Sequence, residues 1–168
     1  MCTPNNDVGC MSNDEKVLLV DLDNNILGSC LRKEMRAQNL PHRASYILVF
    51  SSDDRIVVQK RTKHKDYCPG YYEVTAELGI HSPLKHCFSF FFRDSHTTVW
   101  GDFWTCRFEG RVPEDLTLQE SEVESVELMT IKEILQDAEG GKHKQFTPDS
   151  LYALRKWISM NKDNVQEV

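Results

Sequence analysis

The sequence predicts a single domain with both helices and strands (α/β in the broad sense, and α+β by its sheet). Its sheet is expected to be mixed and mostly antiparallel. Several apolar runs with strand character lie between turn signals, and the run at 45–50 is the strongest of them. A periodic apolar stripe follows helix-start signals near the end of the chain. A length of 168 residues suits one domain and is enough to bury a core without disulfides or metals.

The first half of the chain is predicted to be mostly strands. Residues 17–21 and 26–29 form two short strands around a turn at 23–25, and 32–38 is either a linker or one or two helical turns. Residues 45–50 and 55–61 form a hairpin across a tight turn at 51–54. A turn at Cys68-Pro69-Gly70 then leads into a strand at 71–75.

The second half is predicted to add strands at 88–92, 99–108 and 125–129 and a short helix at 131–137, followed by a flexible loop at 139–144. In the 99–108 strand, alternation places Trp100 and Trp104 on one face with Cys106 and Phe108. Core packing explains these aromatic residues better than stacking on a base.

The final helix has the clearest local signals. Thr147 is expected to be its N-cap, Pro148 its first residue, and Asp149 a charge that complements the helix dipole. The apolar stripe that it buries consists of Leu151, Leu154 and Ile158, with Trp157 beside it.

Composition limits the partners and the location. The net charge of −6 argues against non-specific binding to nucleic acid or membranes, and no apolar run reaches membrane-spanning length. The N-terminus lacks the features of a secretion signal, so a cytoplasmic protein with free thiols at its six cysteines is expected. We expect a disordered leader at 1–15, the domain at 16–160 and a polar tail at 161–168.

A family resemblance rests on stretches spread over nearly the whole chain. They include 42–46 (HRASY), 58–62 (VQKRT), 68–76 (CPGYYEVTA), 77–80 (ELGI), 99–101 (VWG) and 146–151 (FTPDSL). In order and spacing this series resembles the Nudix hydrolases, specifically the branch similar to isopentenyl-diphosphate isomerase. The resemblance implies a mixed sheet sandwiched by helices, and Mg²⁺-dependent hydrolysis of a diphosphate linked to another moiety.

The resemblance fails at the catalytic signature of the family. The Nudix box reads G-x5-E-x7-R-E-U-x-E-E-x-G-U, where U is a bulky aliphatic residue. Only its end is present here: Glu77 matches the last glutamate, Gly79 the glycine and Ile80 the closing aliphatic residue. A loop and most of a helix, on the order of 20 residues, have no counterpart. The box helix is therefore predicted to be largely missing, and no catalytic residue can be assigned.

Four residues are candidate ligands of Mg²⁺ or Mn²⁺ by the resemblance: Glu77, Glu120, Glu122 and His42. Glu120 and Glu122 would lie on one side of the chain if this stretch is extended. The alternative is that Glu77 is an orphaned surface carboxylate and that the other glutamates belong to a solvated acidic loop. One remaining box carboxylate cannot hold the metals alone, because Mg²⁺ takes several hard oxygen ligands.

Three further residues, Arg43, Gln59 and Arg61, are candidates for binding the substrate. They flank the predicted hairpin, and arginine is a natural bidentate partner of phosphate. Surface charge at strand ends is an equally good interpretation. The basic run at 60–65 is expected to be a solvated edge, although it could attract an anionic ligand.

The sequence therefore predicts a Nudix-family hydrolase domain whose activity is impaired, with a small-molecule diphosphate as its partner. Two alternatives stay open. The chain could be a non-catalytic module that binds a diphosphate or another anion. It could also be a box-deleted isoform of an active Nudix hydrolase.

Overall fold

A computed structural model describes residues 15–75, 82–140 and 144–161. Three predicted parts lie outside the described residues. They are Glu77 with the remnant of the box, the leader except for Glu15, and the tail except for Asn161. The strands are β1 (Lys16–Val20), β2 (Ile26–Leu31), β3 (His42–Ser51), β4 (Ile56–Arg61), β5 (Tyr72–Glu73), β6 (Lys85–Arg93), β7 (Thr98–Phe108) and β8 (Val123–Met129). The helices are α1 (Arg32–Gln38), α2 (Ile131–Gly140) and α3 (Pro148–Met160).

The strands pair as a mixed, mostly antiparallel sheet, which confirms the predicted fold class. The order is β2-β1-β3-β4-β5, and β8 pairs with the other edge of β4. Strand β7 runs parallel to β3 along the whole of β3 and carries β6 antiparallel on its outer side. All the other pairings are antiparallel.

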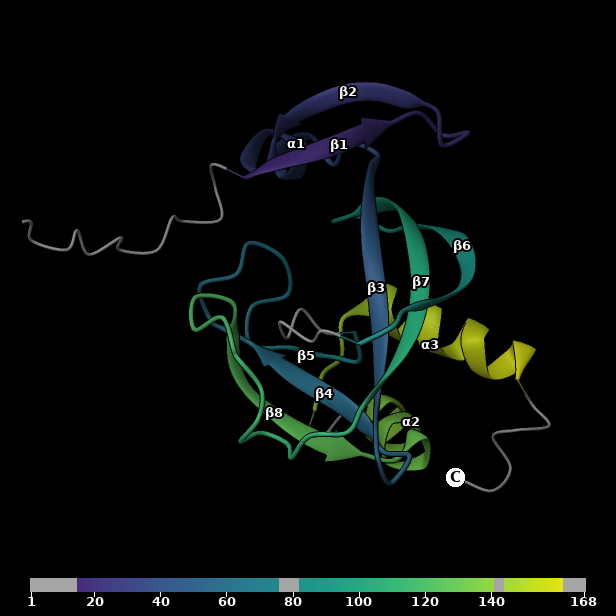
Figure 1. The fold of residues 1–168 in the computed structure, drawn as a ribbon. Coiled ribbons are helices and arrows are strands. Elements are labelled where there is room, and N and C mark those ends of the chain that lie inside the picture. Colours follow the sequence, from purple (N-terminus) through teal and green to yellow (C-terminus); the bar gives the residue numbers. More distant parts are fainter. Residues whose placement is uncertain (1–14, 76–81, 141–143, 162–168) are drawn as a thin grey trace, which may run out of the picture.

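The hairpin of β3 and β4 opens into a V (Figure 1). Its turn is closed by the Ser51 amide, which donates to the Arg55 carbonyl over 2.8 Å, and by Asp54 in the left-handed region at φ 64°. The two strands share one registered pair, Phe50 with Ile56, after which β5 replaces β3 as the neighbour of β4. Side chains of β3 and β4 in the opening therefore have no neighbour across this hairpin, and several of them line a cavity.

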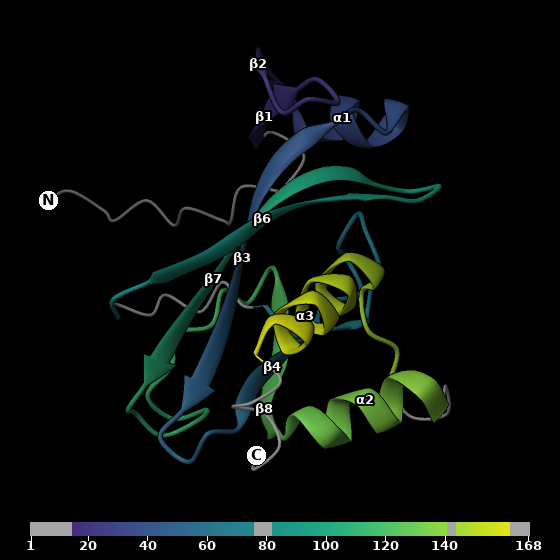
Figure 2. The same ribbon diagram turned by 90° about the vertical axis from the view of Figure 1, so that its right-hand side faces the viewer.

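The main core lies between the sheet and the two late helices, and Figure 2 shows α3 in front of the strands with α2 beneath it. Leu48 of β3, Phe103 of β7, Ile134 of α2 and Leu154 of α3 are fully buried there. Burying one such side chain contributes roughly 1.5–3 kcal/mol, so this layer dominates the stability of the fold. A smaller cluster around Val49 is covered by the irregular segment 112–118.

Several local expectations are corrected. The open choice at 32–38 resolves as helix α1, anchored by buried Met35 and ended by Asn39 at φ 48°. Helix α2 runs on to Gly140, into the predicted loop. Strand β5 is shorter than predicted, with two residues (Tyr72–Glu73) in place of the five expected at 71–75.

The alternation predicted for β7 agrees with its unbroken register, but the core packing expected for its two tryptophans is wrong. Cys106 and Phe108 do pack in the smaller cluster. Trp100 and Trp104 are only half-buried, and they pack against Phe91 and His86 of β6. The opposite face of β7 supplies the main core instead.

The four cysteines in the described residues, Cys30, Cys68, Cys87 and Cys106, are free thiols, as predicted. Within the same residues, no helix has the length and apolar character needed to cross a membrane.

Candidate functional site

A cavity of about 610 Å³ lies in the opening between β3 and β4. Strand β3 contributes Arg43, strand β4 contributes Gln59 and Arg61, and all three are the residues predicted to bind a substrate. The wall also includes residues of α1, the 62–71 connection, β5, the 119–123 segment and the start of α3, together with Glu15 and Val17 at the start of β1. Segments far apart in the sequence thus meet at one polar site.

The β4 side of the cavity is organised around the carboxylate of Glu73. Gln59 is registered with Glu73 across β4 and β5, and alternation places Arg61 on the same face as Gln59. Gln59 Nε2 and Arg61 NH1 donate to Glu73 Oε2 over 2.9 and 2.7 Å. Arg61 Nε also donates to the Tyr67 carbonyl. Burial lowers the pKa of Arg61, but the charge and hydrogen bond of Glu73 outweigh it and leave the pKa raised.

The β3 side presents Arg43, whose orientation comes from the β1–β2 turn. Its Nε and NH2 donate to the side-chain oxygen of Asn24 over 3.1 and 2.9 Å, and NH2 also reaches the Asn24 carbonyl. Asn24 has a left-handed φ of 66°, which is common for asparagine in turns. The turn therefore holds this guanidinium at the cavity wall.

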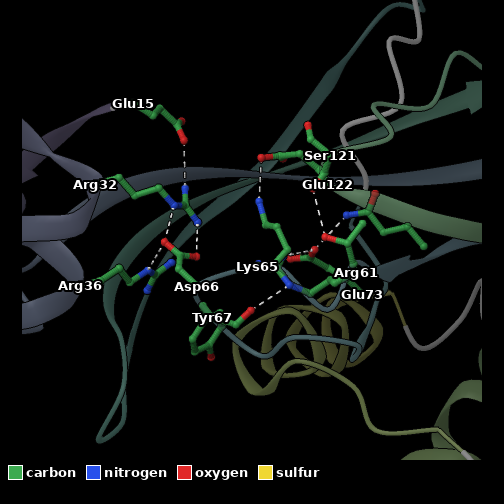
Figure 3. Close-up of polar contacts among 12 residues, drawn as sticks. Glu15, Arg32, Arg36, Arg61, Lys65, Asp66, Tyr67, Glu73, Ser121 and Glu122 are labelled. Carbon is green, nitrogen blue, oxygen red and sulfur yellow. Dashed lines mark hydrogen bonds and ion pairs between the residues drawn. The ribbon is translucent and has the colours of Figure 1, made fainter. Parts of the chain in front are cut away.

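Two arginines of α1, which the sequence analysis did not select, complete the wall (Figure 3). Arg32 Nε and NH2 donate to both oxygens of Asp66 over 2.8 and 3.2 Å, and NH1 reaches Glu15 over 3.4 Å. Arg36 lies one helical turn further on, with its guanidinium carbon 4.8 Å from the centre of the Tyr67 ring. Their i, i+4 spacing was the available signal.

The basic run at 60–65 is not the solvated edge that was predicted. Arg61 and Lys65 are buried, and Lys65 Nζ lies 2.8 Å from Glu122 Oε1. Lys63 and His64 are exposed as expected, and Lys60 forms a more exposed pair with Glu124. The fold turns part of the run inward because the 62–71 connection crosses the cavity.

The carboxylate of Asp149 also lies at the cavity and is buried. The Tyr46 hydroxyl donates to it over 2.7 Å, and the Tyr67 hydroxyl over 3.4 Å. Burial, together with the negative charge of Asp149, raises the pKa of both phenols, so they remain donors. Asp149 is thus an internal hydrogen-bond acceptor in addition to its predicted place in the first turn of α3.

The predicted metal ligands are not brought together. His42 and Glu122 line the cavity, whereas Glu120 lines a separate one beside Lys63 and His64. The condition that this stretch be extended is not met, because residues 120–122 form a turn. Glu77 is outside the described residues.

The surroundings of the remaining candidates do not suit Mg²⁺ or Mn²⁺. Burial and the nearby charges of Arg36 and Arg32 hold the pKa of His42 at about 4, and a cation would be repelled there. Glu122 forms an ion pair with Lys65. Across residues 15–75, 82–140 and 144–161, no group of three or more His, Cys, Asp or Glu side chains is arranged to hold a metal ion.

Comparison with curated proteins places the chain in a family. No protein-family model matches it. It is 35% identical over 175 aligned positions to an uncharacterized Nudix hydrolase, YfcD, of Salmonella typhi, covering 92% of this chain and 90% of that protein. YfcD of Escherichia coli K12 is 34% identical, with 92% of each chain covered. The chain therefore belongs to the Nudix hydrolase family.

The likeness to isopentenyl-diphosphate isomerase is partial. The Serratia proteamaculans enzyme is 37% identical over 59 residues, which is 35% of this chain and 33% of that protein. The assignment to the family is confirmed, and the isomerase likeness is confined to one part of the chain.

Solved structures show the same fold. DR0079 of Deinococcus radiodurans superposes with a TM-score of 0.67 at 14% identity, covering 84% of this chain and 98% of that one. The NUDIX domain of Shewanella oneidensis NrtR, solved with ADP ribose, superposes with a TM-score of 0.52 at 12% identity, covering 78% and 99%.

Proposed function

We propose that this chain is a Nudix-fold module that binds a small-molecule diphosphate and has little or no hydrolase activity. The observation that carries the proposal is the charge of the cavity wall. Five cationic side chains line it, against the four carboxylates of Glu15, Glu73, Glu122 and Asp149. The cations are Arg32, Arg36, Arg43, Arg61 and Lys65. Guanidinium groups bind phosphate oxygens in pairs, which suits a ligand with two phosphoryl groups.

The loss of hydrolysis is supported by the ligand geometry and by the sequence. Hydrolysis of a diphosphate needs metal ions that neutralise the phosphate charge and a positioned water. The candidate metal ligands in the described residues are dispersed or paired with cations. In addition, 92% of this chain is about 155 residues, so about 20 of the 175 positions aligned with the Salmonella relative have no residue here.

The nature of the ligand is supported by the fold. The Shewanella domain is described in complex with ADP ribose, which contains a diphosphate. We infer a ligand of that general class for this chain, acting in the cytoplasm without nucleic acid or membrane partners.

Thermal unfolding with and without ligand tests the proposal. Pyrophosphate or ADP-ribose should stabilise the purified chain without Mg²⁺, by about 2.7 kcal/mol at a hundred times the Kd. Mg²⁺ should release no product from a panel of nucleoside diphosphate derivatives. Turnover that disappears in Glu77→Gln would overturn the non-catalytic assignment. Lack of stabilisation by every diphosphate tried would overturn the binding role.

A second origin fits the same sequence, namely a box-deleted product of a gene whose full form encodes an intact box. The flanking sequence matches in order and spacing, and a clean excision explains this better than gradual decay. The test is to read the genomic and transcript sequence between the codons of Thr75 and Glu77. If the genomic and transcript sequences are continuous between these codons, with no segment that encodes the box, this origin is excluded.

A further inference from the structure

The two arginines of α1, which both line the cavity, share the carboxylate of Asp66, which lies behind the wall and is not part of the lining. Asp66 accepts two hydrogen bonds from Arg32, while Arg36 Nε lies 3.7 Å from Asp66 Oδ2, beyond hydrogen-bond range. The arginine side chains are 16% and 17% exposed, so solvent screens them only in part. Glu15, the second carboxylate of Arg32, is 53% exposed and 3.4 Å away. Asp66 is therefore the main buried partner of Arg32 and only a distant partner of Arg36.

Arg36 is the under-satisfied member of this pair. Its NH1 donates to Thr97 Oγ1 over 3.1 Å, and its guanidinium stacks on Tyr67. Its Nε is one of three buried side-chain atoms that have no hydrogen-bond partner among the described residues. Leaving a buried donor unpaired costs about 1–3 kcal/mol, and more for a charged group. An anion that takes the place of the Asp66 carboxylate would supply the missing acceptor.

We propose that Arg32 and Arg36 form an anion subsite for one phosphoryl group of the ligand, and that Asp66 is the internal counter-ion they release when it binds. The proposal rests on the proposed function and adds residues and a mechanism of competition to it. Asp66 occupies the fork of Arg32 as a phosphoryl group would, because carboxylate and phosphate present two oxygens with similar spacing.

The position of Asp66 allows this exchange. It lies on the 62–71 connection instead of a strand, between Lys65 and Tyr67, which both line the cavity. Figure 3 shows Arg32 and Arg36 converging on Asp66 from α1, while Lys65 is directed to Glu122 on the other side. The connection thus bridges two parts of the wall and is held to α1 through the Asp66 carboxylate and through the stacking of Arg36 on Tyr67. Binding of an anion to the arginines would loosen that attachment.

Isothermal titration with inorganic pyrophosphate and with ADP-ribose, at low ionic strength, tests the proposal on the full chain. Asp66→Asn should bind roughly tenfold tighter than the unmodified protein, since the internal competitor loses its charge. Asp115→Asn is the matched control: Asp115 holds Arg111 through the same two-point contact, 3.1 and 2.8 Å, at an exposed loop that lines neither cavity. It should leave the affinity unchanged.

Arg36→Gln provides a second readout that leaves the pair of Arg32 and Asp66 in place. It should weaken binding roughly tenfold and remove the gain seen in Asp66→Asn when the two are combined. If Asp66→Asn fails to fold, Arg36→Gln decides alone. Unchanged affinity in the folded variants, or weaker binding in Asp66→Asn, overturns the subsite while the proposed function stands. No binding to any form overturns both.

Discussion

At the scale of single residues, His42 shows how surroundings decide a role. Its type and position suggested a metal ligand by resemblance. In the structure its Nδ1 lies 3.1 Å from the Leu40 carbonyl, and the ring is buried near two arginines. Burial is the largest cause of its lowered pKa, and the positive charges of Arg36 and Arg32 add to it. His42 is therefore neutral at physiological pH.

This pKa predicts an acid-sensitive stability. The folded-state pKa of about 4 lies below the ordinary value of 6.5, so the unfolded chain binds the proton first. Stability attributable to His42 is present above pH 6.5 and is lost as the pH falls towards 4. The loss should reach roughly 2 kcal/mol between pH 7 and pH 5. Urea unfolding at both values measures it.

Two variants assign this loss. His42→Asn can still donate to the Leu40 carbonyl and should show a smaller difference between pH 7 and pH 5. His86→Gln, at a more exposed position on β6, should keep the dependence of the unmodified protein. An identical loss in His42→Asn would show that other groups cause it.

The residues of the site were predictable where local pattern decides. Gln59 and Arg61 flank the predicted hairpin, and both line the cavity in the structure. Arg32 and Arg36 were missed because their role depends on how α1 meets the 62–71 connection, which no local pattern specifies. Glu120 and Glu122 were expected on one side only if their stretch was extended, and a turn carries them and directs them to different cavities.

At the scale of elements, the first turn of α3 begins the helix and also makes a buried polar contact with the sheet. Thr147 occupies the N-cap as predicted, but its hydroxyl contacts Ser150 Oγ at 2.6 Å and makes no capping bond to the backbone. Asp149 turns inward to Tyr46 of β3. A buried polar contact thus fixes the register of the helix against the strand, and the sequence alone could not show that Asp149 would be covered.

Removing one phenol hydroxyl tests this contact. Tyr46→Phe removes the 2.7 Å donor of a buried carboxylate and should lower the free energy of unfolding by about 1–3 kcal/mol. Tyr67→Phe removes the longer contact at 3.4 Å and should cost less. Chemical denaturation of both variants gives the comparison. The reverse order would mean that Asp149 depends mainly on Tyr67.

The packing around Gly101 of the β6–β7 hairpin leaves no space for a side chain at this position. A Cβ at this position would collide with the rings of Phe90 and Tyr46, which are both buried in the main core. Gly101→Ala should therefore destabilise the chain by about 1–3 kcal/mol. Gly140→Ala, at the end of α2 with open space around it, should be neutral or stabilising by up to about 1 kcal/mol. Equal melting temperatures for the two variants would contradict the packing described.

At the scale of the whole molecule, the fold was predictable and the cavity was not. Strand and helix positions follow from local periodicity, and most boundaries agree within a few residues. The V between β3 and β4 depends on which strand pairs with each part of β4. That pairing is decided only when the whole sheet assembles. The cavity, and with it the cationic wall, results from that choice.

The last prediction concerns the part of the Nudix box that the sequence is expected to lack. Inserting a loop and helix with that part of the box between Ala76 and Glu77 should supply a carboxylate-bearing helix. Mg²⁺ would then have ligands, and Mg²⁺-dependent release of product from nucleoside diphosphate derivatives should rise at least about a hundredfold.

A Gly/Ser insert of the same length is the control for the added chain, and it should give no activity. Replacing the glutamates of the inserted segment by glutamine should abolish the gain, because amides neutralise metal charge poorly. Activity with the Gly/Ser insert would place the chemistry in residues already present here. Absence of activity with the intact insert, in a folded protein that still binds pyrophosphate, would show that the cavity has become specialised for binding alone.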